Sequence, residues 1–198
     1  MKTDVLPGYR IEEARMEQSD ALFPALGAIE RACARIFPPG YIPEEFLDHT
    51  VPAELLAEGV ANAALFVAFA AEGTAKEKGP GQAADPAGIS QGKPVGYALL
   101  RYCDGHALLA QIDVHPEHAR QGLGAALVKK IAEKAKSDGY NALYLTTFTS
   151  IVWNAPFYAR LGFKALAGEQ EPAFLKPILR LERDAGLPDR TGMRLALD

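Results

Sequence analysis

Apolar side chains recur along the chain with two spacings, one typical of helices and one typical of strands. Residues 123–135 place an apolar side chain at every fourth position, the spacing of a helix with one buried face. Residues 142–148 form a short apolar and β-branched run of the kind found in strands. The same pattern predicts strands at 9–15, 65–70, 95–102, 107–114, 142–148, from 163 and at 192–197, with helices at 19–37, 122–137, 154–161 and 172–185. This order of elements predicts an α+β (mixed α/β) fold with a largely covered sheet.

Two segments interrupt this pattern. Residues 38–62 carry prolines between short helical stretches, which predicts a looping, partly exposed arm. Residues 73–94 contain five glycines, three prolines and hardly any large apolar side chain. Such a composition cannot bury enough surface to hold itself rigid, so we expect a flexible insertion there. With this insertion, residues 1–198 are expected to form a single domain.

The composition, 48% hydrophobic and 23% charged over 198 residues, is that of an ordinary soluble globular protein. A formal net charge of -4 with scattered basic residues argues against nucleic-acid binding, which needs clustered Lys and Arg. Cys33 and Cys103 lie far apart without a partner motif, so neither a disulfide framework nor a zinc site is expected, and a reducing cytoplasm fits. The N-terminus lacks an apolar signal core and no apolar run reaches the 18 residues of a membrane span, so we expect neither export nor membrane insertion.

A glycine-rich turn, Gln121-Gly122-Leu123-Gly124-Ala125, follows the strand that ends at Val114 and opens the next helix. A strand that runs into such a turn leaves several backbone N–H groups unpaired beside the positive end of the helix dipole. This arrangement suits a phosphate, and Arg120 adds a positive charge at its rim. The turn lacks the Gly-Lys-Ser/Thr of a P-loop, and Leu127 breaks the dinucleotide fingerprint. A plain tight turn remains an alternative.

A second motif lies in the short helix predicted at 154–161. Phe157 and Leu161 are four residues apart and are expected to face the core, which turns Tyr158 toward a cleft. Gly162 then ends the helix, with Phe163 placed for the hydrophobic contact that follows a glycine cap. Taken alone, Tyr158 also fits an edge residue of an amphipathic helix.

Together, the two motifs resemble the GNAT superfamily of acyl-CoA-dependent N-acetyltransferases. The signature of that family places Arg/Gln-x-x-Gly-x-Gly/Ala after a strand ending in Val-x-Pro, and Tyr-x-x-Leu-Gly-Phe farther along the chain. Val114-His115-Pro116, the glycine turn and Tyr158 to Phe163 supply these parts, so the resemblance covers roughly residues 60–165. It implies a mostly antiparallel, bent sheet of about seven strands that splays between its fourth and fifth strands near a bulge, with helices on both faces.

The resemblance also implies a role for each matching position, with acetyl-CoA as the cosubstrate. The pantetheine arm would lie along the backbone of Ile112 to Val114 and bond to Asn154. Arg160 would reach the 3′-phosphate, and Tyr158 would protonate the departing thiolate. The pyrophosphate would lie on the backbone amides of Arg120, Gln121, Gly122, Leu123, Gly124 and Ala125.

The base that removes the proton from the amine is harder to assign. Transfer requires the neutral nitrogen, so a lysine-like acceptor needs a base. Many relatives carry a Glu on the fourth strand three residues before the Val, whereas this chain has Gln111 there. Asp113 shares a strand face with Gln111 and is the candidate base or water organiser, with a structural carboxylate as the alternative. Glu30 and His106 are weaker candidates.

His115 and His118 lack further ligands at metal-site spacing, so no metal is expected. The sequence therefore predicts direct acetyl transfer, in a ternary complex, to a primary amine of a small molecule or peptide. The alternatives are a non-catalytic acyl-CoA-binding or regulatory module and a nucleotide-dependent oxidoreductase. The sequence leaves the oligomeric state open between a monomer and a homodimer.

The acceptor pocket follows from the same resemblance. It is expected to lie between the first helix, residues 172–188 and the proline-rich arm, which carries Phe37, Tyr41 and Phe46. These aromatic side chains favour a small or peptide-like acceptor.

Overall fold

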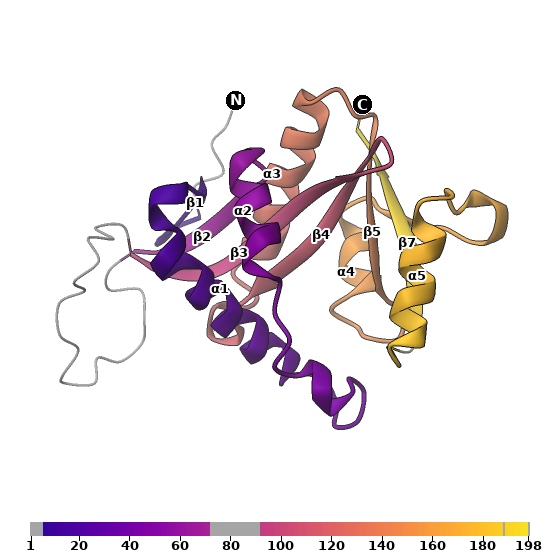
Figure 1. Ribbon diagram of the computed structural model, residues 1–198, viewed down its shortest axis with the longest axis horizontal. Helices are drawn as coiled ribbons and strands as arrows, with labels where there is room; N and C mark the ends of the chain where they lie inside the picture. The colour runs from indigo at the N-terminus through magenta and orange to yellow at the C-terminus, as the bar shows by residue number, and fades with distance from the viewer. Residues whose placement is uncertain (1–5, 72–91, 188, 198) are drawn as a thin grey trace.

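The computed structural model describes residues 6–71, 92–187 and 189–197, which form a seven-stranded sheet with helices packed against it (Figure 1). The strands are β1 (Tyr9–Glu13), β2 (Leu65–Ala70), β3 (Lys93–Cys103), β4 (His106–Val114), β5 (Ala142–Phe148), β6 (Lys164–Ala165) and β7 (Arg190–Ala196). The helices are α1 (Ser19–Ala34), α2 (Ala53–Ala61), α3 (Leu123–Ser137), α4 (Ala155–Arg160) and α5 (Leu175–Asp184). Short 3-10 turns lie at Met16–Gln18, Glu44–Phe46, Pro116–His118 and Gly168–Gln170.

The sheet has the strand order β1-β2-β3-β4-β5-β7-β6, and its one parallel pair among the described strands is β4 with β5. These two strands pair only at Ala107 with Leu143 and at Leu108 with Tyr144. Beyond Leu108 they diverge, as Figure 1 shows. The register between β3 and β4 shifts there, so that Ala110 is an extra residue that forms a bulge. The predicted mixed fold, with its splay and bulge, is confirmed.

Helices cover both faces of the sheet, and the apolar patterns explain why. α3 buries Leu123, Leu127 and Ile131 against one face, and α1 buries Leu22 and Leu26 against the other. Because β2 is covered on both sides, all six of its side chains are apolar rather than alternating. Each fully buried Leu or Ile contributes about 1.5–3 kcal/mol of transfer free energy, so these stripes hold the helices in place.

The two irregular segments have different outcomes. The arm at 38–62 contains a regular helix, α2, whose Leu56 is buried in the core between α1 and the sheet. A Cβ at Gly59 would lie 2.4 Å from Leu99 Cδ1, so this helix packs closely on β3. Of the insertion expected at 73–94, residues 73–91 lie outside the described part, while Lys93 and Pro94 already belong to β3. Within the described residues, no helix has the length and apolar character needed to cross a membrane.

Candidate active site

A cavity of about 460 Å3 lies where β4 and β5 separate. Leu109 to Asp113 of β4 form one side, and Leu145 to Phe148 of β5 form the other. Side chains from both layers of helices and from the arm complete the lining: Glu30, Cys33, Ala34, Phe37, Ile42, Phe46, His49, Thr50, Val51, Asn154, Tyr158, Glu182, Leu187 and Arg190. The cavity lies between α1, the arm and the segment around α5, where the acceptor pocket was expected. Phe37 and Phe46 line it, whereas Tyr41 does not.

The edge of β4 beside the cavity is free of strand partners beyond Leu108. The N–H of His115 donates to Val95 O of β3 at 2.8 Å. Because backbone groups alternate along a strand, those of Ile112 and Val114 point to the other side, toward the splay. The Cys33 thiol donates to Val114 O at 3.2 Å, and burial raises the pKa of this thiol. The place of Cys33 on this edge was not expected from the sequence.

Asp113 lies on the same stretch of β4 and faces the cavity. Gln111 Nε2 donates to Asp113 Oδ2 at 2.6 Å, as their shared strand face predicts. Burial raises the pKa of Asp113 from 3.8 to about 7, although the hydrogen bond from Gln111 opposes this and the charge of Glu30 adds to it. The carboxyl can therefore change protonation state near neutral pH.

Glu30 on α1 stands beside Asp113 with only one of its oxygens in a well-formed hydrogen bond. The N–H of Val51 donates to Glu30 Oε2 at 2.8 Å, whereas Oε1 is buried without a well-formed hydrogen bond among the described residues and interacts with the side chain of Tyr97. Burial raises the pKa of Glu30, with the Val51 bond acting against it. Glu30 follows Leu26 by four positions, so its place on the buried stripe of α1 is a signal the sequence contains.

Tyr97 of β3 completes this buried polar group. It lies opposite Asp113 in the strand register, and its hydroxyl is buried beside Glu30 without a well-formed hydrogen bond in the described part of the chain. Burial, then the charges of Asp113 and Glu30, raise its pKa. Three acidic or phenolic groups thus share one poorly solvated region beside the cavity.

Tyr158 reaches the cavity from α4. Its ring packs edge-on against Phe157 and Phe163, with centroids 5.1 and 5.7 Å away. Burial raises the pKa of Tyr158, the charge of Asp113 raises it further, and Arg190 acts the other way. The phenol is therefore kept protonated. Asn154, just before α4, also lines the cavity, and its side chain does not cap the helix.

The wall opposite Asp113 is a closed polar network. Arg190 donates to Glu182 through Nε, at 3.0 Å from Oε2, and through Nη2, at 2.6 Å from Oε1. Thr146 Oγ1 donates to Glu182 Oε1 at 2.6 Å and accepts from Arg190 Nη2 at 2.9 Å. The guanidinium lies 4.5 Å from the ring centroid of Phe148. No motif in the sequence indicated this network, because its members come from β5, α5 and β7.

The glycine turn opens α3 as predicted, and its two glycines serve different needs. Gly122 has φ +84, a left-handed conformation that favours glycine, and Arg120 is also left-handed at φ +62. A Cβ at Gly124 would lie 3.3 Å from Phe157 Cζ, so this glycine lets α4 approach α3. The N–H of Ala126 bonds to Gly122 O within the helix, which leaves the amides of residues 123–125 without an intrahelical partner.

The residues predicted to bind the cofactor differ in exposure. Arg120, Gln121 and Arg160 are exposed, while Leu123 is buried in the core and Ala125 is partly buried. The side chain of Leu123 thus anchors α3, and only its backbone is available to a ligand.

Aromatic side chains extend from the arm to the end of β5. Phe37 contacts Tyr41, Phe148 and Trp153, with ring centroids 6.0, 5.3 and 6.0 Å away. Tyr41 is also hydrogen-bonded to Ser150 Oγ at 2.6 Å. The arm is thereby fastened to the strand on the far side of the splay.

The histidines considered from the sequence have partners of their own. His118 is buried with Nδ1 3.0 Å from the Tyr9 hydroxyl, and His106 Nδ1 lies 2.8 Å from Asp104 O. His106 is not part of the cavity lining. Across residues 6–71, 92–187 and 189–197, no group of three or more His, Cys, Asp or Glu side chains could hold a metal ion.

The fold is similar to those of several solved acetyltransferases. It is similar to the N-acetylglutamate synthase of Neisseria gonorrhoeae, solved with coenzyme A and N-acetyl-glutamate, at a TM-score of 0.62 and 16% identity over 96% of this chain and 35% of that one. It is also similar to the PaiA N-acetyltransferase of Thermoplasma acidophilum, solved with coenzyme A, at a TM-score of 0.59 and 16% identity over 95% of this chain and 98% of that one.

The sequence identifies the family. Residues 62–163 match the acetyltransferase (GNAT) family, and the chain belongs to it. An amino-acid acetyltransferase of Aeromonas salmonicida is 31% identical over 100 residues, which are 49% of this chain and 22% of that protein. The chain thus spans about a fifth of that relative and about a third of the synthase. The resemblance stated from the two motifs is confirmed.

Proposed function

We propose that the protein is an N-acetyltransferase that moves the acetyl group of acetyl-CoA directly to a primary amine in a ternary complex. The observation that carries this proposal is that Tyr158 and Asp113 line one cavity where β4 and β5 separate. A retained proton on one side and a carboxyl that titrates near neutral pH on the other are what the reaction needs. Membership of the acetyltransferase family supports it.

The cofactor would lie along the splay. Its pyrophosphate would accept hydrogen bonds from the backbone amides of residues 120–125, beside the positive end of α3. The pantetheine would pair with the edge of β4 at Ile112 and Val114 and with Asn154. Arg160, exposed on the last turn of α4, would meet the 3′-phosphate. Val114 O already accepts the Cys33 thiol, so the pantetheine would share this oxygen or displace the thiol.

The chemistry divides between the two sides of the cavity. Asp113 first takes a proton from the ammonium form of the acceptor, because only the neutral nitrogen attacks. The nitrogen then bonds to the thioester carbonyl carbon and loses its second proton to solvent. As the carbon–sulfur bond breaks, the electron pair stays on sulfur, and Tyr158 gives its proton to the thiolate. The need for a base is greatest for a lysine-like amine of pKa about 10.4, because deprotonating its ammonium form at pH 7 costs about 4.6 kcal/mol.

The decisive test is release of coenzyme A thiol from acetyl-CoA with a panel of primary amines. We expect some amines to accelerate release, and Tyr158→Phe to lower kcat by about 100-fold, because the leaving thiolate loses its proton donor. Calorimetric affinity for coenzyme A serves as the control and should stay within about twofold, since backbone amides carry most of the binding. Tight coenzyme A binding with no amine-dependent release would instead identify an acyl-CoA-binding or regulatory module.

The wider setting follows from charge and thiols. Cys33 and Cys103 are both free, which supports a reducing, cytoplasmic location. The net charge of -4 supports an acceptor other than nucleic acid. We further infer that residues 1–198 act as one domain, and light scattering of the purified chain would distinguish a monomer from a homodimer.

A further inference from the structure

The cavity is acidic on one wall and electrically balanced on the other. Asp113 and Glu30 belong to the wall formed by β4 and α1. On the opposite wall, Arg190 is the one Lys or Arg side chain among the described lining residues, and Glu182 holds it in a two-point ion pair at 2.6 and 3.0 Å. The other basic side chain of the lining, His49, packs edge-on against Phe46 at 4.8 Å.

Apolar side chains lie between these walls, beside polar ones such as Thr50, Thr147 and Asn154. Phe37, Phe46 and Phe148 contribute aromatic rings, and Ile42 and Leu187 contribute aliphatic side chains. Phe37 and Phe148 pack against each other with centroids 5.3 Å apart. A cavity of about 460 Å3 lined in this way has room for a small molecule and the acetylated end of the cofactor.

We propose that the acceptor is a small primary amine with an apolar, preferably aromatic, body and no carboxylate beside the amine. The inference rests on the proposed function and adds the substrate class. The ammonium group of such an acceptor pairs with Glu30 and Asp113, and its body packs against the phenyl rings. A carboxylate would lose its hydration next to the balanced Glu182–Arg190 pair without gaining a counter-charge. The acceptor class therefore differs from the amino acid in the name of the Aeromonas relative.

Three matched acceptors test this with the full-length protein and acetyl-CoA. L-Phenylalanine carries the carboxylate, L-phenylalaninamide replaces it with a neutral group of similar size, and 2-phenylethylamine lacks it. The amine pKa is lower in the amide and higher in phenylethylamine than in phenylalanine, so basicity alone cannot favour both. We expect kcat/KM for both compounds without the carboxylate to exceed that for phenylalanine by about tenfold or more.

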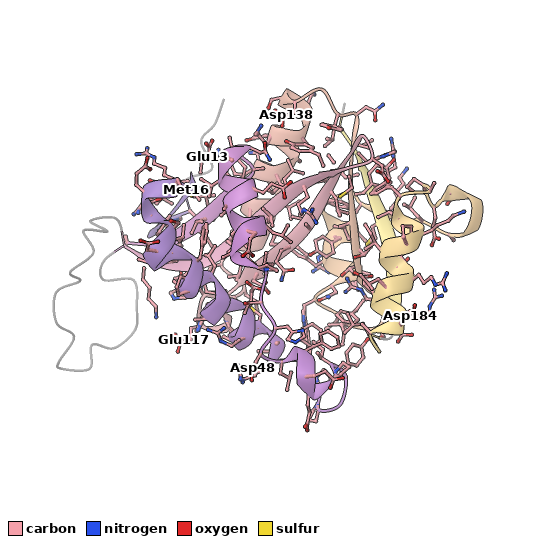
Figure 2. All side chains as sticks on the ribbon, viewed as in Figure 1. Glu13, Met16, Asp48, Glu117, Asp138 and Asp184 are labelled. Carbon is pink, nitrogen blue, oxygen red and sulfur yellow. The ribbon has the colours of Figure 1, made fainter. Side chains whose placement is uncertain are left out.

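A variant that frees Arg190 gives the converse test. Glu182→Gln leaves the Arg190 guanidinium without a counter-charge. The ratio of kcat/KM for phenylethylamine to that for phenylalanine should therefore fall by about fivefold in this variant. Asp184→Asn is the matched control on the same helix, because Asp184 lies on the outer side of the molecule in an exposed pair with Arg180 (Figure 2). This control should keep the wild-type preference. Thermal unfolding of both variants establishes that they are folded.

Each outcome decides the question. Equal or faster transfer to phenylalanine in the wild type overturns this inference and leaves the proposed function standing. An unchanged preference in folded Glu182→Gln overturns the assignment of selectivity to the balanced pair. If no amine in a broad panel accelerates thiol release although coenzyme A binds, the proposed function fails and the inference falls with it.

Discussion

The two walls of the cavity differ in how completely their polar groups are hydrogen-bonded. On the β4 and α1 side, Glu30 Oε1 has no well-formed hydrogen bond among the described residues, and burial raises the pKa of Asp113 to about 7. On the β5 and α5 side, Thr146, Glu182 and Arg190 bond to one another through charged and neutral hydrogen bonds. Incompletely satisfied buried groups are those that exchange protons readily, while a satisfied network fixes shape and charge. We therefore assign chemistry to the first wall and selectivity to the second.

Removing the carboxylate of the first wall should have the largest effect. Asp113→Asn keeps the size and the bond with Gln111 but cannot take a proton, so we expect kcat/KM to fall by about 1,000-fold. The control is Asp104→Asn, at an exposed hairpin position with φ +47 that Asn tolerates, and it should act like the wild type. Steady-state thiol release measures both. A loss of less than about threefold would move the role of base to Glu30.

Breaking the Glu182–Arg190 ion pair of the second wall should lower the free energy of unfolding more than the rate of acetyl transfer. The side chains of Arg190 and Glu182 are 15% and 17% exposed, so Arg190→Met leaves a largely buried carboxylate without its partner. We expect it to lose about 3 kcal/mol of unfolding free energy, measured by urea denaturation.

Two further variants separate the causes. Adding Glu182→Leu to Arg190→Met removes the stranded charge and should restore most of the lost stability. Arg180→Met breaks the exposed pair with Asp184, whose side chains are 81% and 66% exposed, and should cost less than about 0.5 kcal/mol. Equal losses from Arg180→Met and Arg190→Met would contradict the contrast between the walls.

The smallest expected effect is the pH dependence that Asp113 adds. The reaction needs its carboxylate, so the ratio of wild-type to Asp113→Asn activity should rise about tenfold between pH 6 and 8, around a midpoint near 7. Taking the ratio cancels the titration of the acceptor amine.

Stability should change in the opposite direction. The folded pKa of Asp113 lies above its ordinary value of 3.8, so the folded state binds more protons than the unfolded state between these values. Asp113 therefore lowers stability as the pH rises from about 4 to 7, and Asp113→Asn should lack this decline. A ratio that stays flat with pH, or a variant with the same decline, would argue against an Asp113 that titrates near neutrality.

Local patterns predicted the elements and half of the site. Periodicity alone predicted the helix at 123–135 and the strand at 142–148, and the glycine turn with Tyr158 indicated where a cofactor would bind. The contact of Cys33 with Val114 and the pairing of Glu182 with Arg190 join separate elements, so no local spacing could indicate them. Position 124 favours glycine because a side chain there would crowd the ring of Phe157, which belongs to another helix. The strand at 65–70 was predicted, but its burial on both faces became clear only from the structure.

The short pairing of β4 with β5 also has a consequence for how the protein comes apart. Antiparallel pairing joins β1, β2, β3 and β4 into one half of the sheet and β5, β7 and β6 into the other. Two residue pairs between β4 and β5 link these halves. Local opening should therefore spread within a half more readily than across the boundary. A cofactor arm bound between the diverging strands would supply the cross-links that the backbone omits, so ligand concentration would set how far the two halves unfold as one cooperative unit.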